Sequence, residues 1–407
     1  MRTSKKLGFI AVIFLFSRFA VAQPTEIVVW HAYRAGEKAA IEKVVAAYNA
    51  EKASSGVKVT TLAVPYDAFA DKISAAVPRG KGPDIFIYAQ DRLGGWIEAG
   101  NTVEPIDFFL DKATKDRFLP TTMEAMTYRG SVYGLPLNYK VITMIYNKAI
   151  VQTPPKTSGE LVTLAKKLTD RTTGKFGLAY WYADFYYHAA LMNAFGGRVF
   201  DPGPKPVLNA PENVKSIELL VKWFDVGGFM PAEPSTALIT SLFNEGKAGI
   251  VFSGPWFLGE IAKNINYGLA PLPTIDEAGG KPMRPWMTVE GVYVAGPSKH
   301  KDQAYDFAMY LTDLPSAKIM AVEGRQTPAN KAVYNDAQVA GDPVLSAFRK
   351  QVEVAIPMPN LPEMTMVWSP ATTAMNTITH KTALPKAALD LAQKELEAKV
   401  AALRKKP

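Results

Sequence analysis

The chain has 407 residues, of which 48% are hydrophobic and 21% charged, so it is long enough for two or three domains and too apolar to be disordered throughout. Lys and Arg number 46 against 38 Asp and Glu, but four of the basic residues lie within the first 20, and the rest of the chain carries a net charge of only +4. This small excess argues against a nucleic-acid-binding protein, and the lack of cysteine excludes disulfides, thiolate metal sites and cysteine nucleophiles.

The first 22 residues have the pattern of a secretory signal peptide. Basic residues precede the apolar run Leu7–Phe16, and the small-residue pattern Ala20-Val21-Ala22 follows it. The run is shorter than the roughly 20 residues that cross a bilayer, which disfavours a membrane anchor. We expect cleavage after Ala22 and a soluble mature protein in a Gram-negative periplasm.

The mature chain begins with alternating strands and helices. Apolar runs predict strands at 27–30, 57–64 and 84–88, and helical spacing of apolar residues predicts helices around 41–48 and 69–73. This βαβαβ order is typical of a parallel sheet that is covered by helices.

A second set of the same kind follows. The tetrapeptide Thr157-Ser158-Gly159-Glu160 is typical of a capping box at the start of a helix. The later elements expected in chain order are a strand at 176–181, a helix at 214–224, strands at 248–253, 267–271 and 289–295, and a mostly helical remainder at 304–403. We therefore predict an α/β fold of two lobes that are joined by several crossing segments, because no flexible linker is present.

Common catalytic and cofactor motifs are absent from the sequence. The four histidines are scattered without metal-ligand spacing, and no GxSxG, GxxxxGK[ST] or GxGxxG motif occurs. We expect no metal and no cofactor.

Carboxylates are abundant, and a glycosidase would need two of them facing one bond. The acids weighed for this role are Asp84, Asp91, Asp107, Asp184 and Glu290. Asp91 and Arg92 directly follow a predicted strand, where open α/β sheets bind ligands. Asp84 and Asp107 are more typical of capping or surface residues, and spacing alone pairs none of the five.

Aromatic residues give a more informative pattern. The segment Trp181–His188 has five aromatic rings in eight residues, too many to be buried on one side of a strand or helix. Trp256, Trp286 and Trp368 lie at chain breaks or helix starts, although core packing is the alternative for each of them. Flat rings mixed with charged side chains suit a sugar, whose apolar face packs on a ring while its hydroxyls accept charge-assisted hydrogen bonds.

The segment 82–95, GPDIFIYAQDRLGG, resembles the maltose/maltodextrin-binding proteins of bacterial ABC importers. The resemblance continues in the same order over nearly the whole mature chain, in the motifs Ile145–Lys148, Pro154–Thr157, Phe243–Lys247, Gly254–Trp256, Asn266–Gly268, Leu272–Thr274 and Met358–Pro362.

The resemblance implies a periplasmic-binding-protein fold with the ligand between two lobes. The expected lobes are 26–138 plus 274–330 and 143–268 plus 336–405. It further implies a monomeric receptor without catalysis, which binds an oligosaccharide and delivers it to the membrane permease subunits of an ABC importer.

The resemblance also implies the binding residues. In the first lobe Tyr88 corresponds to the aromatic wall, and Asp91 with Arg92 to a polar pair that binds sugar hydroxyls. In the second lobe the corresponding acid and rings are Asp184, Tyr186, Trp256 and Trp368.

Several positions depart from the family pattern. Lys140 replaces an acid before the IYNK motif, and Arg34-Ala35 replaces an Asp-Lys pair. Thr372 replaces an arginine, and Tyr88 a tryptophan. Lys140 and Arg34, the two added cations, are therefore further candidate ligand-binding residues.

The roles of Lys140 and Arg34 stay open at this point. They can donate to neutral hydroxyls, pair with Asp184 or Asp91, or bind an anionic sugar. A receptor for an anionic ligand such as a glycerol phosphate, and a secreted glycosidase, remain the alternatives to a maltodextrin receptor.

Overall fold

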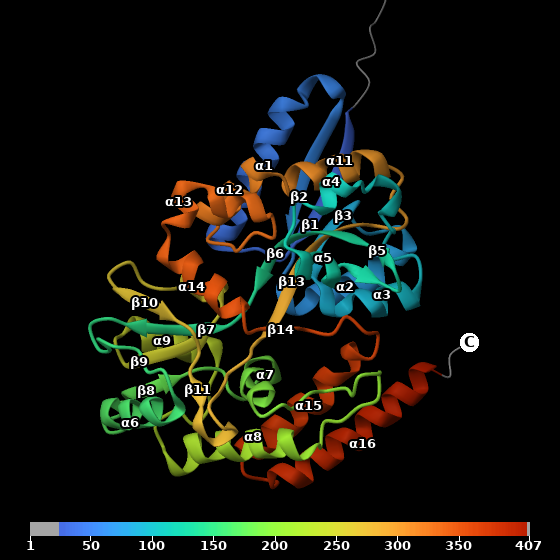
Figure 1. The fold of residues 1–407 in the computed structure, drawn as a ribbon. Coiled ribbons are helices and arrows are strands. Elements are labelled where there is room, and N and C mark those ends of the chain that lie inside the picture. Colours follow the sequence, from blue (N-terminus) through green and yellow to red (C-terminus); the bar gives the residue numbers. More distant parts are fainter. Residues whose placement is uncertain (1–23, 405–407) are drawn as a thin grey trace, which may run out of the picture.

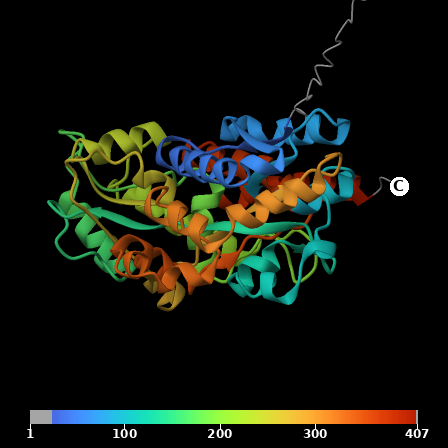
Figure 2. The ribbon, with the colours of Figure 1, turned by 90° about the horizontal axis from the view of Figure 1, so that it is seen from above.

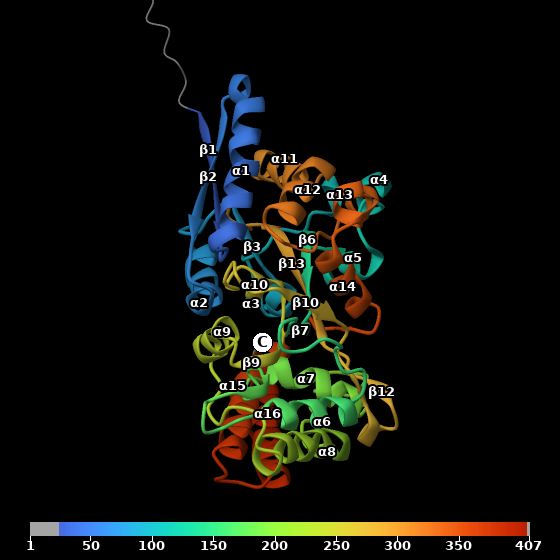
Figure 3. The ribbon, with the colours of Figure 1, turned by 90° about the vertical axis from the view of Figure 1, so that its left-hand side faces the viewer.

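The computed structural model describes residues 24–404, so the predicted signal peptide lies outside the described residues. The chain forms two lobes, each built around its own sheet (Figures 1 and 3). No helix within 24–404 combines the length and the apolar character that a membrane span requires.

The first lobe contains a mixed sheet with the strand order β14-β13-β3-β1-β2 and with β6 also paired to β13. Its strands are β1 (Thr25–His31), β2 (Val57–Ala63), β3 (Ile85–Ala89), β6 (Gly134–Lys140), β13 (Trp286–Val294) and β14 (Ile356–Pro357). A short hairpin, β4 (Thr127–Tyr128) and β5 (Ser131–Val132), lies beside it. The central strand β3 is fully buried, as expected of a sheet covered on both faces.

The second lobe has a sheet with the order β10-β7-β9-β8. Its strands are β7 (Thr143–Asn147), β8 (Phe176–Ala179), β9 (Ala248–Ser253) and β10 (Tyr267–Ala270), and a hairpin is formed by β11 (Thr274–Ile275) and β12 (Lys281–Pro282). All six residues of β9 are buried, which is why that strand reads as a continuous apolar run.

Helices lie on either side of the strands (Figure 2). Those of the first lobe are α1 (Ala35–Glu51), α2 (Tyr66–Ala76), α3 (Leu93–Ala99), α4 (Lys112–Lys115), α5 (Pro120–Ala125), α11 (Lys301–Leu311), α12 (Leu314–Val322) and α13 (Ala337–Ala340). Those of the second lobe are α6 (Ser158–Leu168), α7 (Phe185–Ala194), α8 (Pro211–Val221), α9 (Thr236–Asn244), α10 (Pro255–Leu258), α15 (Met364–Thr379) and α16 (Pro385–Arg404). Helix α14 (Pro343–Val352) contacts the second-lobe strands β7 and β10.

The α/β class and the predicted strands are confirmed, and β1, β2 and β3 of the βαβαβ segment are parallel, as expected. Other strands make both sheets mixed. Strand β13 runs antiparallel to β3 and β6, and β7 runs antiparallel to β9 and β10. Both β13 and β7 directly follow a crossing from the other lobe, so they enter their sheets against the direction of the local strands.

The lobe bounds differ in places from those expected, which assign 274–330 to the first lobe and 336–405 to the second. Strand β14 pairs with β13 in the first-lobe sheet, and α13 packs on α12 of the same lobe. The β11–β12 hairpin contacts the second lobe, where Gly159 N donates to Asp276 Oδ2 and Ser158 Oγ donates to Glu277. The predicted helix start at Thr157 is confirmed. Thr157 caps α6 by accepting a hydrogen bond from Glu160 N at 3.2 Å.

The backbones of two sequence motifs, 82–95 and Met358–Pro362, approach each other closely at Gly94. Gly94 N donates to Asn360 O at 3.1 Å, and a Cβ at Gly94 would lie 2.4 Å from that oxygen. Only glycine allows this contact. It holds the turn at Asp91 against the segment that leads into α15, the helix that carries Trp368.

Candidate interlobe binding site

Four aromatic rings of the predicted site region form one continuous cluster. The ring centroid of Tyr186 lies 6.2 Å from Trp256 and 6.5 Å from Trp286, and Trp286 lies 6.0 Å from Trp368. Trp286 is buried, whereas Tyr186, Trp256 and Trp368 are half-buried and keep part of each ring accessible. The buried ring of Trp286 thus links Tyr186 and Trp368, and the three half-buried rings belong to one cluster.

Asp184 is positioned at the N-terminus of α7, the helix that carries Tyr186. Its Oδ1 accepts a hydrogen bond from Tyr186 N at 2.9 Å, which caps the helix. Burial raises the pKa of the Asp184 carboxyl, while hydrogen bonds from the backbone N–H groups of Tyr186 and Tyr187 oppose this shift. The cap fixes both the acid and the tyrosine at one place on the second lobe.

Asp91 and Arg92 lie in a single 3₁₀ turn, Gln90–Arg92, directly after β3. Asp91 is 5% exposed, and its Oδ2 lies 3.3 Å from Arg92 Nε. Burial raises the pKa of Asp91 to about 6, although Arg92 and Trp368 lower it. Within residues 24–404, the buried N–H groups of Arg92 Nε and Trp368 make no well-aligned hydrogen bond, although both act on Asp91. A ligand hydroxyl beside Asp91 would offer these N–H groups a better-aligned acceptor.

Two contacts show that the lobes meet at this site. The ring of Trp286, on the first-lobe strand β13, lies 6.0 Å from Trp368 and 6.5 Å from Tyr186 of the second lobe. At another part of the interface, Arg34 Nη2 of the first lobe lies 2.7 Å from Glu260 Oε1 of the second. The two lobes are thus in contact at both places.

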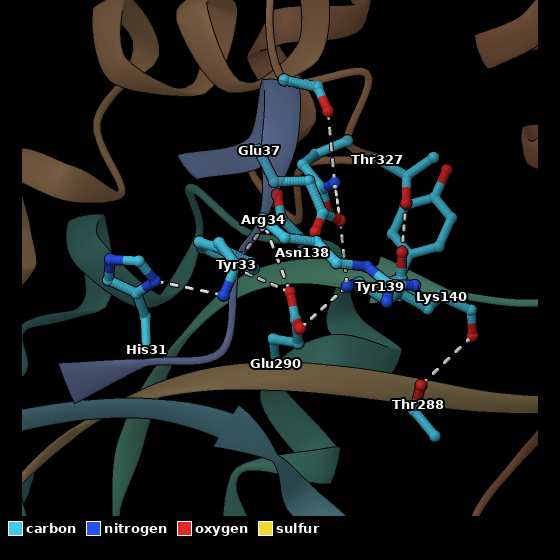
Figure 4. A network of polar contacts seen from close by, with 12 residues as sticks. His31, Tyr33, Arg34, Glu37, Asn138, Tyr139, Lys140, Thr288, Glu290 and Thr327 are labelled. Carbon is cyan, nitrogen blue, oxygen red and sulfur yellow. Dashed lines mark hydrogen bonds and ion pairs between the residues drawn. The ribbon is translucent and has the colours of Figure 1, made fainter. Parts of the chain in front are cut away.

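Lys140 is held in a buried cluster of the first lobe (Figure 4). Its Nζ lies 2.9 Å from Glu290 Oε1 and 3.4 Å from Glu37 Oε1, and each of the three side chains is less than 15% exposed. Tyr33 Oη donates to Glu290 Oε2 at 2.8 Å, and Asn138 Nδ2 donates to Tyr33 Oη at 3.1 Å. Burial opposes the charge of Lys140, but Glu290 and Glu37 outweigh it and raise the pKa of the lysine.

The alternatives for the two added cations can now be compared with the geometry. Lys140 pairs with Glu37 and Glu290, and Arg34 pairs with Glu260, so neither ion pair involves Asp91 or Asp184. Because two carboxylates surround Lys140, the cluster carries no excess positive charge for an anionic ligand.

Tyr88 lies on β3 among other aromatic side chains. Its ring is stacked on Phe69 at 5.2 Å and on Tyr66 at 5.2 Å, and the residue is 5% exposed. Its ring face is therefore packed rather than open, in contrast to the ring surface of the second lobe.

A cavity of about 580 Å³ lies beside the site, between the two lobes. It is lined by α2, α3 and Arg92 of the first lobe and by α15 and α16 of the second, including Ala70, Thr365 and Leu403. The rings of Tyr186, Trp256 and Trp368 do not line it. A small hollow of about 30 Å³ adjoins Trp256, Arg34 and Glu260.

The acids weighed for glycoside hydrolysis each have a partner. Asp84 accepts hydrogen bonds from Val28 N and Ser298 Oγ, and Asp107 accepts one from Val132 N, so both stabilise loops. Asp91, Asp184 and Glu290 have the partners described above. Within residues 24–404, no three His, Asp or Glu side chains are arranged to hold a metal ion.

The structure thus brings Asp91, Arg92, Asp184, Tyr186, Trp256 and Trp368 to one interlobe region. It places Arg34 and Lys140 in ion pairs at the same interface. The sequence analysis did not identify Tyr33 and Glu37, which contact Glu290 and Lys140 in the buried cluster, because no local motif marks either residue.

Comparison with known proteins agrees with this geometry. Residues 32–317 match the model of a family described as bacterial extracellular solute-binding protein. The maltotriose-binding protein of Pyrococcus abyssi is 35% identical over 300 residues, which cover 73% of this chain but slightly less than two thirds, 65%, of that protein. The galactooligosaccharide-binding protein of Bacillus subtilis is 29% identical, with 93% of this chain and 90% of that protein covered.

A solved structure resembles the whole fold. The maltose/maltodextrin-binding domain from Bdellovibrio bacteriovorus bound to maltotriose has a TM-score of 0.85 at 25% identity, and the match covers 93% of this chain and all of that one. These findings confirm the two-lobe fold and the resemblance inferred from the motifs. The chain therefore belongs to the family of bacterial extracellular solute-binding proteins.

Proposed function

We propose that this protein is a periplasmic receptor that binds a neutral maltooligosaccharide between its lobes and delivers it unchanged to an ABC importer. The observation that carries the proposal is the surface formed by Tyr186, Trp256 and Trp368, which is faced by Asp91 and Arg92 of the other lobe. Rings bind the apolar face of a glucosyl unit, and the ionised and N–H groups bind its hydroxyls.

The charge distribution supports a neutral ligand over an anionic one. Lys140 is surrounded by two carboxylates, and Arg34 is paired with Glu260. An anionic sugar would have to displace one of these carboxylates or lie beside it.

Binding without chemistry is supported by the engagement of the carboxylates. Each acid weighed for catalysis caps a helix, holds a loop or pairs with a cation. The proposed mechanism is lobe closure: a ligand that contacts both lobes only when they are closed shifts the population toward the closed form, which the permease then recognises.

The proposal is tested by calorimetric titration of the mature protein with maltotriose, a galactooligosaccharide and glycerol phosphate, followed by an assay of reducing ends. We expect one maltotriose per chain, no binding of glycerol phosphate and no new reducing ends. Binding of glycerol phosphate alone would establish the anionic-ligand receptor instead. Hydrolysis of maltotriose would establish the glycosidase.

Substitution of Trp256 tests the ring surface. We expect Trp256→Ala to weaken maltotriose binding about 10- to 100-fold, because a stacking face is lost together with its buried area. Trp256→Phe keeps a ring and should retain most of the affinity. Equal affinities of the wild type and the Ala variant would remove Trp256 from the site.

A further inference from the structure

We infer that Tyr66, rather than Tyr88, is the aromatic platform of the first lobe; this inference rests on the proposed sugar-binding function. Tyr66 is the first residue of α2 and follows the end of β2 after Val64 and Pro65, so it lies at the edge of the sheet where its parallel strands end. Its side chain is 57% exposed, which is unusual for a large aromatic residue that contacts other rings.

The exposure of the rings decides between the two tyrosines. Tyr88 stacks on Phe69, at an interplanar angle of 14°, and on Tyr66, at 23°, and is only 5% exposed. Tyr88 therefore has little ring surface to offer a ligand. Tyr66, at 57% exposure, is the accessible ring of this group.

Charged groups of the site act on the hydroxyl of Tyr66. Burial raises the pKa of Tyr66 well above its usual value, and Tyr88, Asp91 and Glu290 add to the shift. Tyr66 therefore combines an exposed ring with a hydroxyl that is influenced by the charge of Asp91.

The face of α2 that carries Tyr66 borders the space between the lobes. Ala70 and Ser74 lie four and eight residues after Tyr66, on the same side of the helix, and both line the 580 Å³ cavity with Arg92. Tyr66 is thus one helical turn from an interlobe cavity that is wide enough for a bound molecule. A glucosyl unit on Tyr66 would lie between Asp91 and this cavity.

The experiment compares maltotriose affinities of the wild type with those of Tyr66→Leu and Tyr66→Phe by calorimetry. Leucine keeps an apolar contact with Tyr88 but removes the flat ring, so we expect binding about tenfold weaker. Phenylalanine keeps the ring and should bind within about twofold of the wild type. The matched control is Phe108→Ala, which removes a 93% exposed ring elsewhere on the first lobe and should leave affinity unchanged.

Each outcome has one meaning. Wild-type affinity in Tyr66→Leu would overturn the inference while the proposed function stands. An equal loss in Tyr66→Leu and Tyr66→Phe would assign the effect to the hydroxyl and overturn the stacking role. If the wild type binds no oligosaccharide, the proposed function fails, and the inference falls with it. Thermal unfolding of each free variant shows that the fold is intact.

Discussion

The interface between the lobes contains charges of two kinds, buried and exposed. Lys140 is 13% exposed and lies between two carboxylates of its own lobe, and Asp91 is buried beside Arg92. Arg34, in contrast, is 68% exposed and reaches across to Glu260 of the other lobe. Removing the partner of a buried charge should lower the stability of the lobe. Removing an exposed pair that joins the lobes should change stability little and should act mainly on the equilibrium between open and closed forms.

The largest effect is expected at Lys140. In Lys140→Met, Glu37 and Glu290 stay buried without a cation, so we expect the free energy of unfolding to fall by about 3 kcal/mol. Denaturant unfolding of the free protein measures the change. The matched control is Lys112→Ala, which breaks an ion pair whose lysine is 88% exposed and should change stability little. If the free energy of unfolding of Lys140→Met falls by less than about 1 kcal/mol, burial does not make the charge of Lys140 important for stability.

The second effect concerns Asp91 and pH. Because burial raises the folded pKa of Asp91 to about 6, above the ordinary aspartate value of 3.8, the folded protein holds the Asp91 proton more tightly than the unfolded chain. The contribution of Asp91 to stability therefore falls as pH rises from about 4 to about 6. We expect Asp91→Asn to be more stable than the wild type by about 2–3 kcal/mol at pH 7.

The measurement is the difference in unfolding free energy between the wild type and Asp91→Asn as a function of pH. The difference should shrink as pH falls through 4 and disappear below about pH 3, where Asp91 is protonated in both the folded and unfolded states. The same variant should bind maltotriose more weakly, because an ionised acceptor is lost. A stability difference that does not depend on pH would show that burial does not control this carboxyl.

The smallest effect is expected for the exposed pair. Glu260→Gln removes a contact that joins the lobes only when they are closed, so affinity for maltotriose should fall about two- to fivefold at low salt and by less at high salt. Glu245→Gln breaks a similar exposed pair with Lys247 inside one lobe and is the control. An equal effect of the two variants would mean that the Arg34–Glu260 pair has no special part in closure.

Much of the fold could be predicted because the buried strands are apolar runs, as β9 at Ala248–Ser253 illustrates. Strands β6 and β7 were missed, since β6 contains Pro136, Asn138 and Lys140 and lacks a simple alternation. Strand direction was also missed, because it depends on where the chain crosses between lobes.

The candidate site likewise contains residues that could be predicted from the sequence and residues that could not. Asp91, Arg92 and Trp256 could be predicted because local motifs carry them. The partners of Lys140 could not, because Glu290 is 150 residues away and reaches the lysine only through the register in which β13 pairs with β6. Tyr66 was not among the predicted residues, because its exposure beside the buried ring of Tyr88 arises only when α2 packs on β3.

The central claim is that the cleft between the lobes holds the sugar, and a crystal structure of the mature protein with maltotriose tests it most directly. We expect the sugar on the rings of Tyr186, Trp256 and Trp368, with its hydroxyls bound by Asp91 and Arg92. A maltotriose bound outside the interlobe region, with these side chains arranged as in the free protein, would contradict the account.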